Sequence, residues 1–267
     1  MPFTVSHVAA VLPFSRPLSR WRLLSATIVG SMVPDFGLLL PVRPPRVETH
    51  STLGLLTFCL PLGLLTFWIF QRLIKQAITE ILPNGAYGRW QHSAAPADIT
   101  NAKQWLLAAS GVFIGAVTHL VWDAFTHEGA RGVRMIPALD DPAVDIVGHH
   151  IIGTRLLQDV SSLMGLGLVL LLVVYGLRPA RRGVARPVRR LGAVERYAWI
   201  LAYVVMTAAV AGLFLTIRRP PSSTQSFALW VGTYAIAALR GCAAALLVVS
   251  LALTLRLRAN RAGSRAT

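Results

Sequence analysis

The sequence is poor in charged residues, and above all in acidic ones. Only 14% of the 267 residues are charged, and 11 Asp and Glu stand against 26 Lys and Arg. A soluble domain of this length has about a quarter charged residues, so the deficit indicates that much of the surface faces lipid. Most of the net charge of +15 lies in loops beside apolar segments, where basic residues set orientation and contact anionic lipids. We therefore expect membrane lipids as partners and no nucleic-acid binding.

Features that identify several other protein classes are also missing. Both cysteines, Cys59 and Cys242, lie in apolar segments, so no disulfide framework is expected. The apolar stretch 8–14 is short, contains Pro13 and follows no basic residue, so we expect no secretory signal there. The sequence has neither a G-x-x-x-x-G-K-S/T phosphate loop nor a G-x-S-x-G nucleophile motif. It also has no internal repeat, which argues against a transporter.

Long apolar runs are what the sequence has instead. About 20 apolar residues cross a bilayer as a helix, and the sequence has five clear candidates and a sixth that is apolar only as far as Pro34. Upstream of them, residues 3–14 are expected to form a short helix that dips into the membrane. The sequence therefore predicts an all-α, polytopic membrane bundle of about six transmembrane helices plus this N-terminal helix. The six candidates are 21–40, 53–74, 105–125, 160–177, 197–217 and 227–255.

Basic residues in the loops predict the orientation. Residues 178–196 hold seven arginines against one acidic residue, and the C-terminal tail is also basic. The positive-inside rule places both in the cytoplasm, and the two spans between them agree with this. We thus expect a multi-pass protein of the bacterial cytoplasmic (inner) membrane with a cytoplasmic C-terminus. The expected parts are a membrane core with a His/Asp cluster (1–177), a basic cytoplasmic loop (178–196), an accessory two-helix segment (197–256) and a basic disordered tail (257–267).

Ionisable residues on the apolar run 105–125 and its end are the first functional candidates, because burying them in a membrane is costly. His119, Asp123 and His127 follow at four-residue intervals and share one helix face. Imidazole and carboxylate together suit Zn²⁺, Mn²⁺ or Fe²⁺. On a straight helix His119 and His127 are about 12 Å apart, so all three can bind one ion only if the helix breaks near Phe125. We expect His119 and Asp123 as ligands, with His127 on a bent helix end or at a second ion.

Three more candidates lie near the ends of neighbouring apolar segments. Asp35 and His50 are expected to complete the ligand set at the outer membrane face. His7 can reach this set only if Asp35 lies below the membrane surface, and Ser6-His7 reads equally as a helix start. The alternative for all of these residues is a structural role, in which they bond to backbone or water at helix ends. His149 and His150 are expected in a polar outer loop with a short amphipathic helix, and a role as ligands or general base is the weaker interpretation.

These motifs and their order resemble those of a known membrane-protein family. The sequence contains, in the family's order, MPFTVSH, GSMVPDF, THSTLGLL with PLGLL, THLVWDAFTHEG and LLQDVSS. The likeness is to domain-of-unknown-function family 4184 and covers residues 1 to 176. That family is similar to the inner-membrane metal-dependent hydrolases of domain-of-unknown-function family 457, which share an early His, a Pro-Asp, a Thr-His-Ser and a later His-x-x-x-Asp. The resemblance implies the same chemistry here. The matching positions are His7, Asp35, His50, His119, Asp123 and His127.

Two hypotheses from different classes follow. In the first, the protein is a metal-dependent hydrolase acting on a membrane-associated substrate such as a lipid phosphoester. Zn²⁺ or Mn²⁺ would activate a water molecule and polarise the scissile bond. In the second, it is a non-enzymatic scaffold, sensor or transporter-like protein whose polar cluster bridges helices through hydrogen bonds. In the hydrolase hypothesis the ligands are His50, Asp35, His119 and Asp123, and His7 or His127 is a further ligand or the general base.

Overall fold

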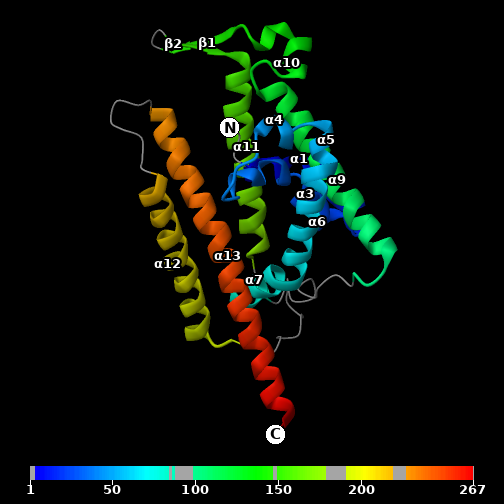
Figure 1. Ribbon diagram of the computed structural model, residues 1–267, viewed down its shortest axis with the longest axis vertical. Coiled ribbons are helices and arrows are strands. Elements are labelled where there is room, and N and C mark those ends of the chain that lie inside the picture. The colour runs from blue at the N-terminus through cyan, green and yellow to red at the C-terminus, as the bar shows by residue number, and fades with distance from the viewer. Residues whose placement is uncertain are drawn as a thin grey trace. The chain divides into compact units, whose positions relative to one another are not determined.

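Long helices make up most of the computed structural model (Figure 1), which describes residues 4–83, 86–87, 99–146, 149–178, 191–218 and 227–266. Within these residues, five helices are long and apolar enough to cross a membrane. This confirms the prediction of an all-helical membrane protein whose apolar surface suits contact with lipid. The five helices are Thr52–Ile81, Ala102–Thr126, Gly153–Gly176, Ala193–Ile217 and Trp230–Asn260.

Residues 21–40 do not form a sixth long helix. They form α3 (Leu24–Gly30) and a 3-10 helix, η3 (Val33–Leu38), with a turn between them. Pro34 explains the interruption, because it lacks an amide hydrogen and its ring clashes with the carbonyl of Gly30 in a continuous α-helix. The count of six transmembrane helices is therefore not confirmed.

The N-terminal segment is helical in four short pieces. They are η1 (Thr4–His7), α1 (Val8–Val11), η2 (Leu12–Phe14) and α2 (Ser15–Arg20). Pro13 occupies an early position of η2, where its missing amide hydrogen breaks no helical bond. The depth of this segment in a membrane stays a prediction.

The chain divides into two compact units. The first contains Met1–Gly37, Pro44–Phe67 and Asp98–Tyr175, and the second contains Leu38–Arg43, Trp68–Ala97 and Gly176–Thr267. The division into parts expected from the sequence for residues 1–177, 178–196 and 197–256 stays a prediction, and most of the basic loop 178–196 lies outside the described residues.

The first unit contains the candidate functional residues. After α3 and η3, the chain forms α4 (Arg46–Thr49), α5 (Thr52–Gly54), the π-helical η4 (Leu55–Cys59) and the start of α6 (Leu60–Ile69). Helix α9 (Ala102–Thr126) follows, then α10 (Arg131–Met135), η7 (Pro137–Leu139) and α11 (Gly153–Gly176). Between η7 and α11, β1 (Pro142–Ile146) and β2 (His149–Ile152) form an antiparallel hairpin. The side chains of His149 and His150 lie outside the described residues.

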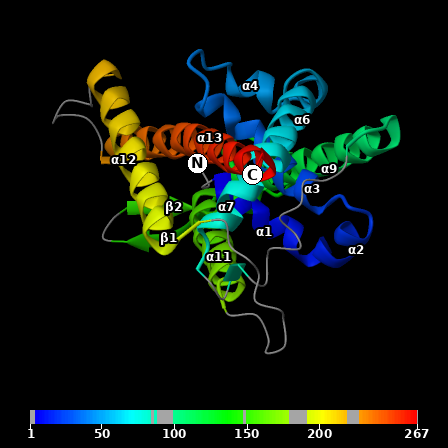
Figure 2. The same cartoon turned by 90° about the horizontal axis from the view of Figure 1, so that it is seen from below.

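Glycines let α3 and α9 pack backbone to backbone, as the two helices lie in Figure 2. A Cβ atom on Gly30 would lie 2.2 Å from the carbonyl oxygen of Val112, and one on Gly115 would lie 2.1 Å from that of Thr27. Gly111 and Gly115 are one turn apart, which is the small-residue spacing that allows close helix approach in membranes. This contact brings the end of α3 beside the next turn of α9, where the first candidate ligand lies.

The second unit contains the end of α6, η5 (Phe70–Ile74), α7 (Lys75–Ile81), α12 (Ala193–Arg218) and α13 (Phe227–Ala266). Helices α12 and α13 lie side by side (Figure 1). Arg240 of α13 donates hydrogen bonds to the carbonyls of Leu38 (2.7 Å) and Leu40 (2.8 Å). Its guanidinium also lies 4.5 Å from the ring centroid of Phe214. Arg240, which is half-buried, is thus paired inside the unit, as arginines within membrane helices usually are.

The C-terminal residues 257–266, which were predicted to be disordered, are helical because α13 continues to Ala266. Arginine, alanine and leucine are strong helix formers. Arg256 also donates to Asn260 one turn later and lies 3.5 Å from Glu195 of α12. Composition alone suggested disorder, whereas helix propensity and these contacts favour continuation of the helix.

Candidate metal centre

Helix α9 brings two candidate ligands to one buried position. Asn101 caps the start of the helix through a reciprocal capping box with Gln104, and the helix continues for 25 residues from Ala102. His119 and Asp123 lie one turn apart on its buried face, with 3.4 Å between His119 Nε2 and Asp123 Oδ2. His119 is fully buried and Asp123 nearly so. Polar groups this deep in an apolar helix need partners.

The orientation of His119 is set by the end of α3. Its Nδ1 lies 2.7 Å from the carbonyl oxygen of Ser31. A carbonyl can only accept a hydrogen bond, so Nδ1 carries the proton and Nε2 keeps its lone pair. Nε2 faces the cluster and has no hydrogen-bond partner among the residues that the structure describes. A histidine held in this way by a backbone carbonyl is typical of a metal ligand.

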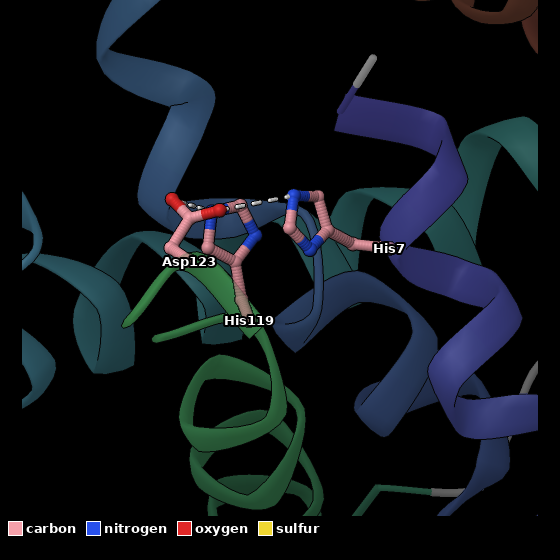
Figure 3. A group of neighbouring side chains, drawn as sticks. All are labelled: His7, His119 and Asp123. Atoms are coloured by element: carbon pink, nitrogen blue, oxygen red, sulfur yellow. Dashed lines mark ion pairs between the residues drawn. The ribbon is translucent and has the colours of Figure 1, made fainter. Parts of the chain in front are cut away.

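His7 does reach the cluster. Its ring stacks on that of His119 with 3.7 Å between centroids, and its Nε2 lies 3.6 Å from Asp123 Oδ1. Figure 3 shows the three side chains pointing toward one another from η1 and α9. Burial, together with the neighbouring His119, lowers the pKa of His7 to about 4. The ring is therefore neutral at physiological pH and offers a lone pair.

His50 and Asp35 come from two further segments of the first unit. His50 Nε2 lies 3.5 Å from Asp35 Oδ1 and 3.4 Å from Asp123 Oδ2. Nδ1 of His50 lies 2.8 Å from Thr49 Oγ1. Burial acts to lower the pKa of His50, but the Asp123 and Asp35 carboxylates outweigh it and raise the pKa above its usual value.

Asp35 is held on its other side by the N-terminal segment. Thr4 Oγ1 donates to Asp35 Oδ2 at 2.9 Å, which leaves Oδ1 facing His50 and His119. Burial acts to raise the pKa of Asp35, but His50, His119 and Thr4 together hold it below the usual value. Asp35 is therefore an ionised carboxylate.

His127 lies beside the cluster but faces another way. Helix α9 ends at Thr126, and His127 has extended backbone (φ −125°, ψ 132°), so its ring folds back over the helix end. Its Nδ1 lies 3.3 Å from the carbonyl oxygen of Asp123, and its Nε2 lies 3.2 Å from a guanidinium nitrogen of Arg46. Since arginine only donates, the lone pair of His127 is directed to Arg46. Burial lowers the pKa of His127.

Arg46 is the site residue that sequence reasoning missed. Its guanidinium donates to Asp123 Oδ2 as well as to His127. In the sequence it read as one more basic loop residue near a membrane face. The available signal was its position four residues before His50, because a single helical turn places both side chains on the same face.

All six predicted residues thus lie close together, and five of them supply ligand atoms to two overlapping groups. Two groups could each hold an ion: His7, His119 and Asp123, and Asp35, His50 and His119. In each group the ligand atoms lie within 4.8 Å of one another. His119 is common to both groups and has only Nε2 available, so the two groups fit one ion rather than two.

The spacing of the ligand atoms also fits an ion. At metal–ligand bonds of about 2.1 Å, neighbouring ligand atoms are about 3.0–3.4 Å apart. The imidazole-to-carboxylate distances here are 3.4–3.8 Å. The Nε2 atoms of His7, His50 and His119 are buried without a hydrogen-bond partner among the described residues. A cation held by either group would satisfy the histidine nitrogens of that group.

Residues 1–251 match the model of one protein family, described as Domain of unknown function (DUF4184). The chain belongs to this family. The match extends well beyond residue 176, where the resemblance noted in the sequence ended, and includes α12 and most of α13. No curated protein and no solved structure matches the chain. The family description assigns no activity, so the chemistry rests on the site itself.

Proposed function

We propose that this DUF4184 protein is a membrane-embedded, metal-dependent hydrolase. The observation that supports the proposal is that buried ligand atoms from four separate segments of the first unit lie close together. Asp35, His50, His119 and Asp123 would hold the ion, and His7 lies in the same ligand shell. A bound divalent ion lowers the pKa of a coordinated water molecule and polarises the scissile bond. The resemblance to the family 457 hydrolases supports the same reaction class.

The donor set favours Zn²⁺ or Mn²⁺. It contains imidazole nitrogens and carboxylate oxygens and no thiolate, because Cys59 donates instead to the carbonyl of Thr49 and lies outside the ligand groups. This mixture suits first-row divalent ions of intermediate softness. The Ser31 carbonyl and Thr49 orient two of the imidazoles, and such supporting contacts fix ligand direction.

The proposed setting is the bacterial cytoplasmic membrane with a cytoplasmic C-terminus. The arginines of residues 178–196 and of the C-terminal segment support this orientation. His50 lies just before the apolar helix Thr52–Ile81, and Asp123 lies near the end of Ala102–Thr126. The cluster would then lie near the outer face, where a membrane-associated substrate can approach.

Metal analysis of the purified full-length protein tests the proposal. We expect about one Zn²⁺ or Mn²⁺ per chain, lost in His119→Ala and kept in His127→Ala, because His119 directs a free lone pair into the cluster and His127 directs its own to Arg46. Thermal stability of each variant, measured in the same detergent, controls for misfolding. A wild-type protein that folds correctly and binds neither ion when supplied contradicts the proposal.

The competing function is a non-enzymatic protein whose cluster joins helices. The contacts from Thr4 to Asp35 and from Arg46 to Asp123 favour it, because each links two segments without an ion. In that case Asp123→Asn would lower thermal stability equally with and without added metal. In the hydrolase, added metal stabilises the wild type and not Asp123→Asn, since a ligand that binds only the folded state stabilises it.

A further inference from the structure

Arg46 presents a guanidinium at the edge of the candidate metal centre with part of its hydrogen-bonding capacity unused. One terminal nitrogen donates to Asp123 and His127. Its Nε is buried and has no hydrogen-bond partner within the described part of the chain. The side chain is 38% exposed, so a ligand can reach it. A buried donor without an acceptor is unfavourable, which points to an acceptor group supplied from outside the chain.

The charge of the site indicates what that acceptor is. The ligand set contains two carboxylates, Asp35 and Asp123, and three imidazoles that coordinate as neutral groups. A divalent ion would balance the two carboxylates. Arg46, which is ion-paired with Asp123, then gives the site one net positive charge at the edge of an apolar protein. The site therefore selects a ligand with a single negative charge.

The planar shape of the Arg46 guanidinium indicates which class of anion the site binds. Arginine presents a planar fork of N–H groups, so two of them can donate to one phosphate oxygen while another holds Asp123 and His127. A phosphodiester has one negative charge shared by two non-bridging oxygens, so one oxygen can face the ion and the other Arg46. A neutral carboxylic ester has a single carbonyl oxygen and would leave the guanidinium without an anionic partner.

We propose that Arg46 is the substrate-binding residue for the phosphate group of a phosphodiester, an inference that rests on the proposed hydrolase function. In the reaction, the oxygen of water forms a bond to phosphorus and the bond from phosphorus to one alcohol oxygen breaks. A proton of the water is transferred to the departing alkoxide, which gives a phosphomonoester and an alcohol. Arg46 holds a non-bridging oxygen throughout and neutralises the charge that gathers on it.

The phosphodiester could belong to a lipid headgroup or to a soluble molecule. Arg46 and His50 lie just before the apolar helix that begins at Thr52. In the proposed membrane setting, this position would lie near the depth of lipid phosphates. A soluble phosphodiester presents the same two oxygens to the same donors. The experiment therefore needs one arm for each source.

Phosphorus NMR on the full-length protein tests the proposal without relying on activity. The protein is purified in a phosphate-free maltoside detergent, loaded with Mn²⁺ and titrated with dimethyl phosphate, whose phosphorus relaxes rapidly when bound near Mn²⁺. The variants are Arg46→Gln and Arg46→Lys, with Arg43→Gln as a control at an exposed arginine of the same connecting segment. Metal content is measured on every sample.

We expect Arg46→Gln to keep its Mn²⁺ and to bind dimethyl phosphate about 10- to 100-fold more weakly than the wild type, with Arg43→Gln unchanged. Arg46→Lys keeps the positive charge but not the planar fork of N–H groups, so it should keep its metal and lose most of its affinity for dimethyl phosphate. This variant tests the role of Arg46 if Arg46→Gln does not fold. Mixed micelles containing phosphatidylglycerol then compete with dimethyl phosphate if the source is a lipid, and a phosphate-free galactolipid does not. Failure to compete assigns a soluble phosphodiester.

Two failures are distinguishable. If Arg46→Gln binds dimethyl phosphate with the affinity of the wild type, the proposed role of Arg46 is wrong and the metal site is unaffected. The same result for Arg46→Lys has this meaning if only that variant folds. A wild-type protein without stoichiometric metal overturns the proposed function, and this inference with it.

Discussion

Histidines of the cluster have their proton positions set by neighbouring acceptors. Ser31 accepts from His119, and the carbonyl of Asp123 accepts from His127. Thr49 Oγ1 donates to the carbonyl of Arg46 and can therefore accept from His50 Nδ1. The consequence is a division of roles within one residue type. His119 and His50 direct Nε2 lone pairs into the cluster, whereas His127 directs its own to Arg46.

The contact from Thr4 to Asp35 is expected to support metal binding. The Thr4 hydroxyl orients the Asp35 carboxylate by donating to Oδ2. Thr4→Val keeps the size of the side chain but removes the donor, so it should weaken Zn²⁺ or Mn²⁺ binding about tenfold, the lower end for the loss of a contact that supports a metal ligand. Competition titration with a chelator of known affinity measures the change.

Thr4→Ser is the matched control, because it keeps the hydroxyl and removes only a methyl group. It should bind the ion with nearly wild-type affinity. Equal affinities for Thr4→Val and Thr4→Ser would show that this contact does not support the ligand.

At the scale of helices, the approach of α3 to α9 positions the centre. The glycines of this contact allow the carbonyl of Ser31 to reach His119. With alanine in place of Gly115, the added methyl group would meet the backbone of α3, so the helices would have to separate. The position of a ligand thus depends on the absence of a side chain one turn before it.

Gly115→Ala should therefore destabilise the protein by about 1–3 kcal/mol, the usual cost of overpacking a tight contact, and weaken metal binding as well. Thermal unfolding in detergent and metal content measure the two effects. Gly167→Ala in α11 is the matched control, since nothing lies within 4 Å of a Cβ atom there, and it should be neutral or slightly stabilising. If the two variants behave alike, the close approach of α3 and α9 does not control the site.

Two helix ends explain where sequence reasoning at this scale succeeded and failed. The four-residue spacing from His119 to His127 predicted one helix face, which His119 and Asp123 share. Helix α9 ends at Thr126, so His127 lies beyond the helix and contacts Arg46 instead. Apolar composition over 21–40 predicted a long helix, but Pro34 and the turn at Ser31 and Met32 divide it. Hydropathy counts apolar residues and does not register which backbone hydrogen bonds can form.

At the scale of the whole molecule, orientation in the membrane is the main prediction. Single cysteines are introduced into a background in which Cys59 and Cys242 are replaced by alanine. Ala138→Cys, an exposed position between α10 and β1, should react with a membrane-impermeant maleimide in intact cells. Asn260→Cys, exposed near the end of α13, should react only after permeabilisation, because the arginines around it favour the cytoplasm.

The reverse labelling pattern would place the cluster at the cytoplasmic face. It would exclude an outer-leaflet substrate while leaving the metal centre itself unaffected. Retained metal content in both cysteine variants controls for correct folding.

The sequence by itself determined that much of the surface faces lipid, how many clear apolar helices there are and which ionisable residues are candidates. Hydropathy, charge bias and residue chemistry are local properties, so they can be read without the fold. The sequence could not determine that His7 stacks on His119, that His127 turns to Arg46, or that Arg46 contacts Asp123. Those facts depend on which segments meet, and that was decided by glycine contacts between helices and by a helix that ends one residue before His127. Only the tertiary structure brings groups that are more than 100 residues apart to within hydrogen-bonding or ligand-binding range of one another.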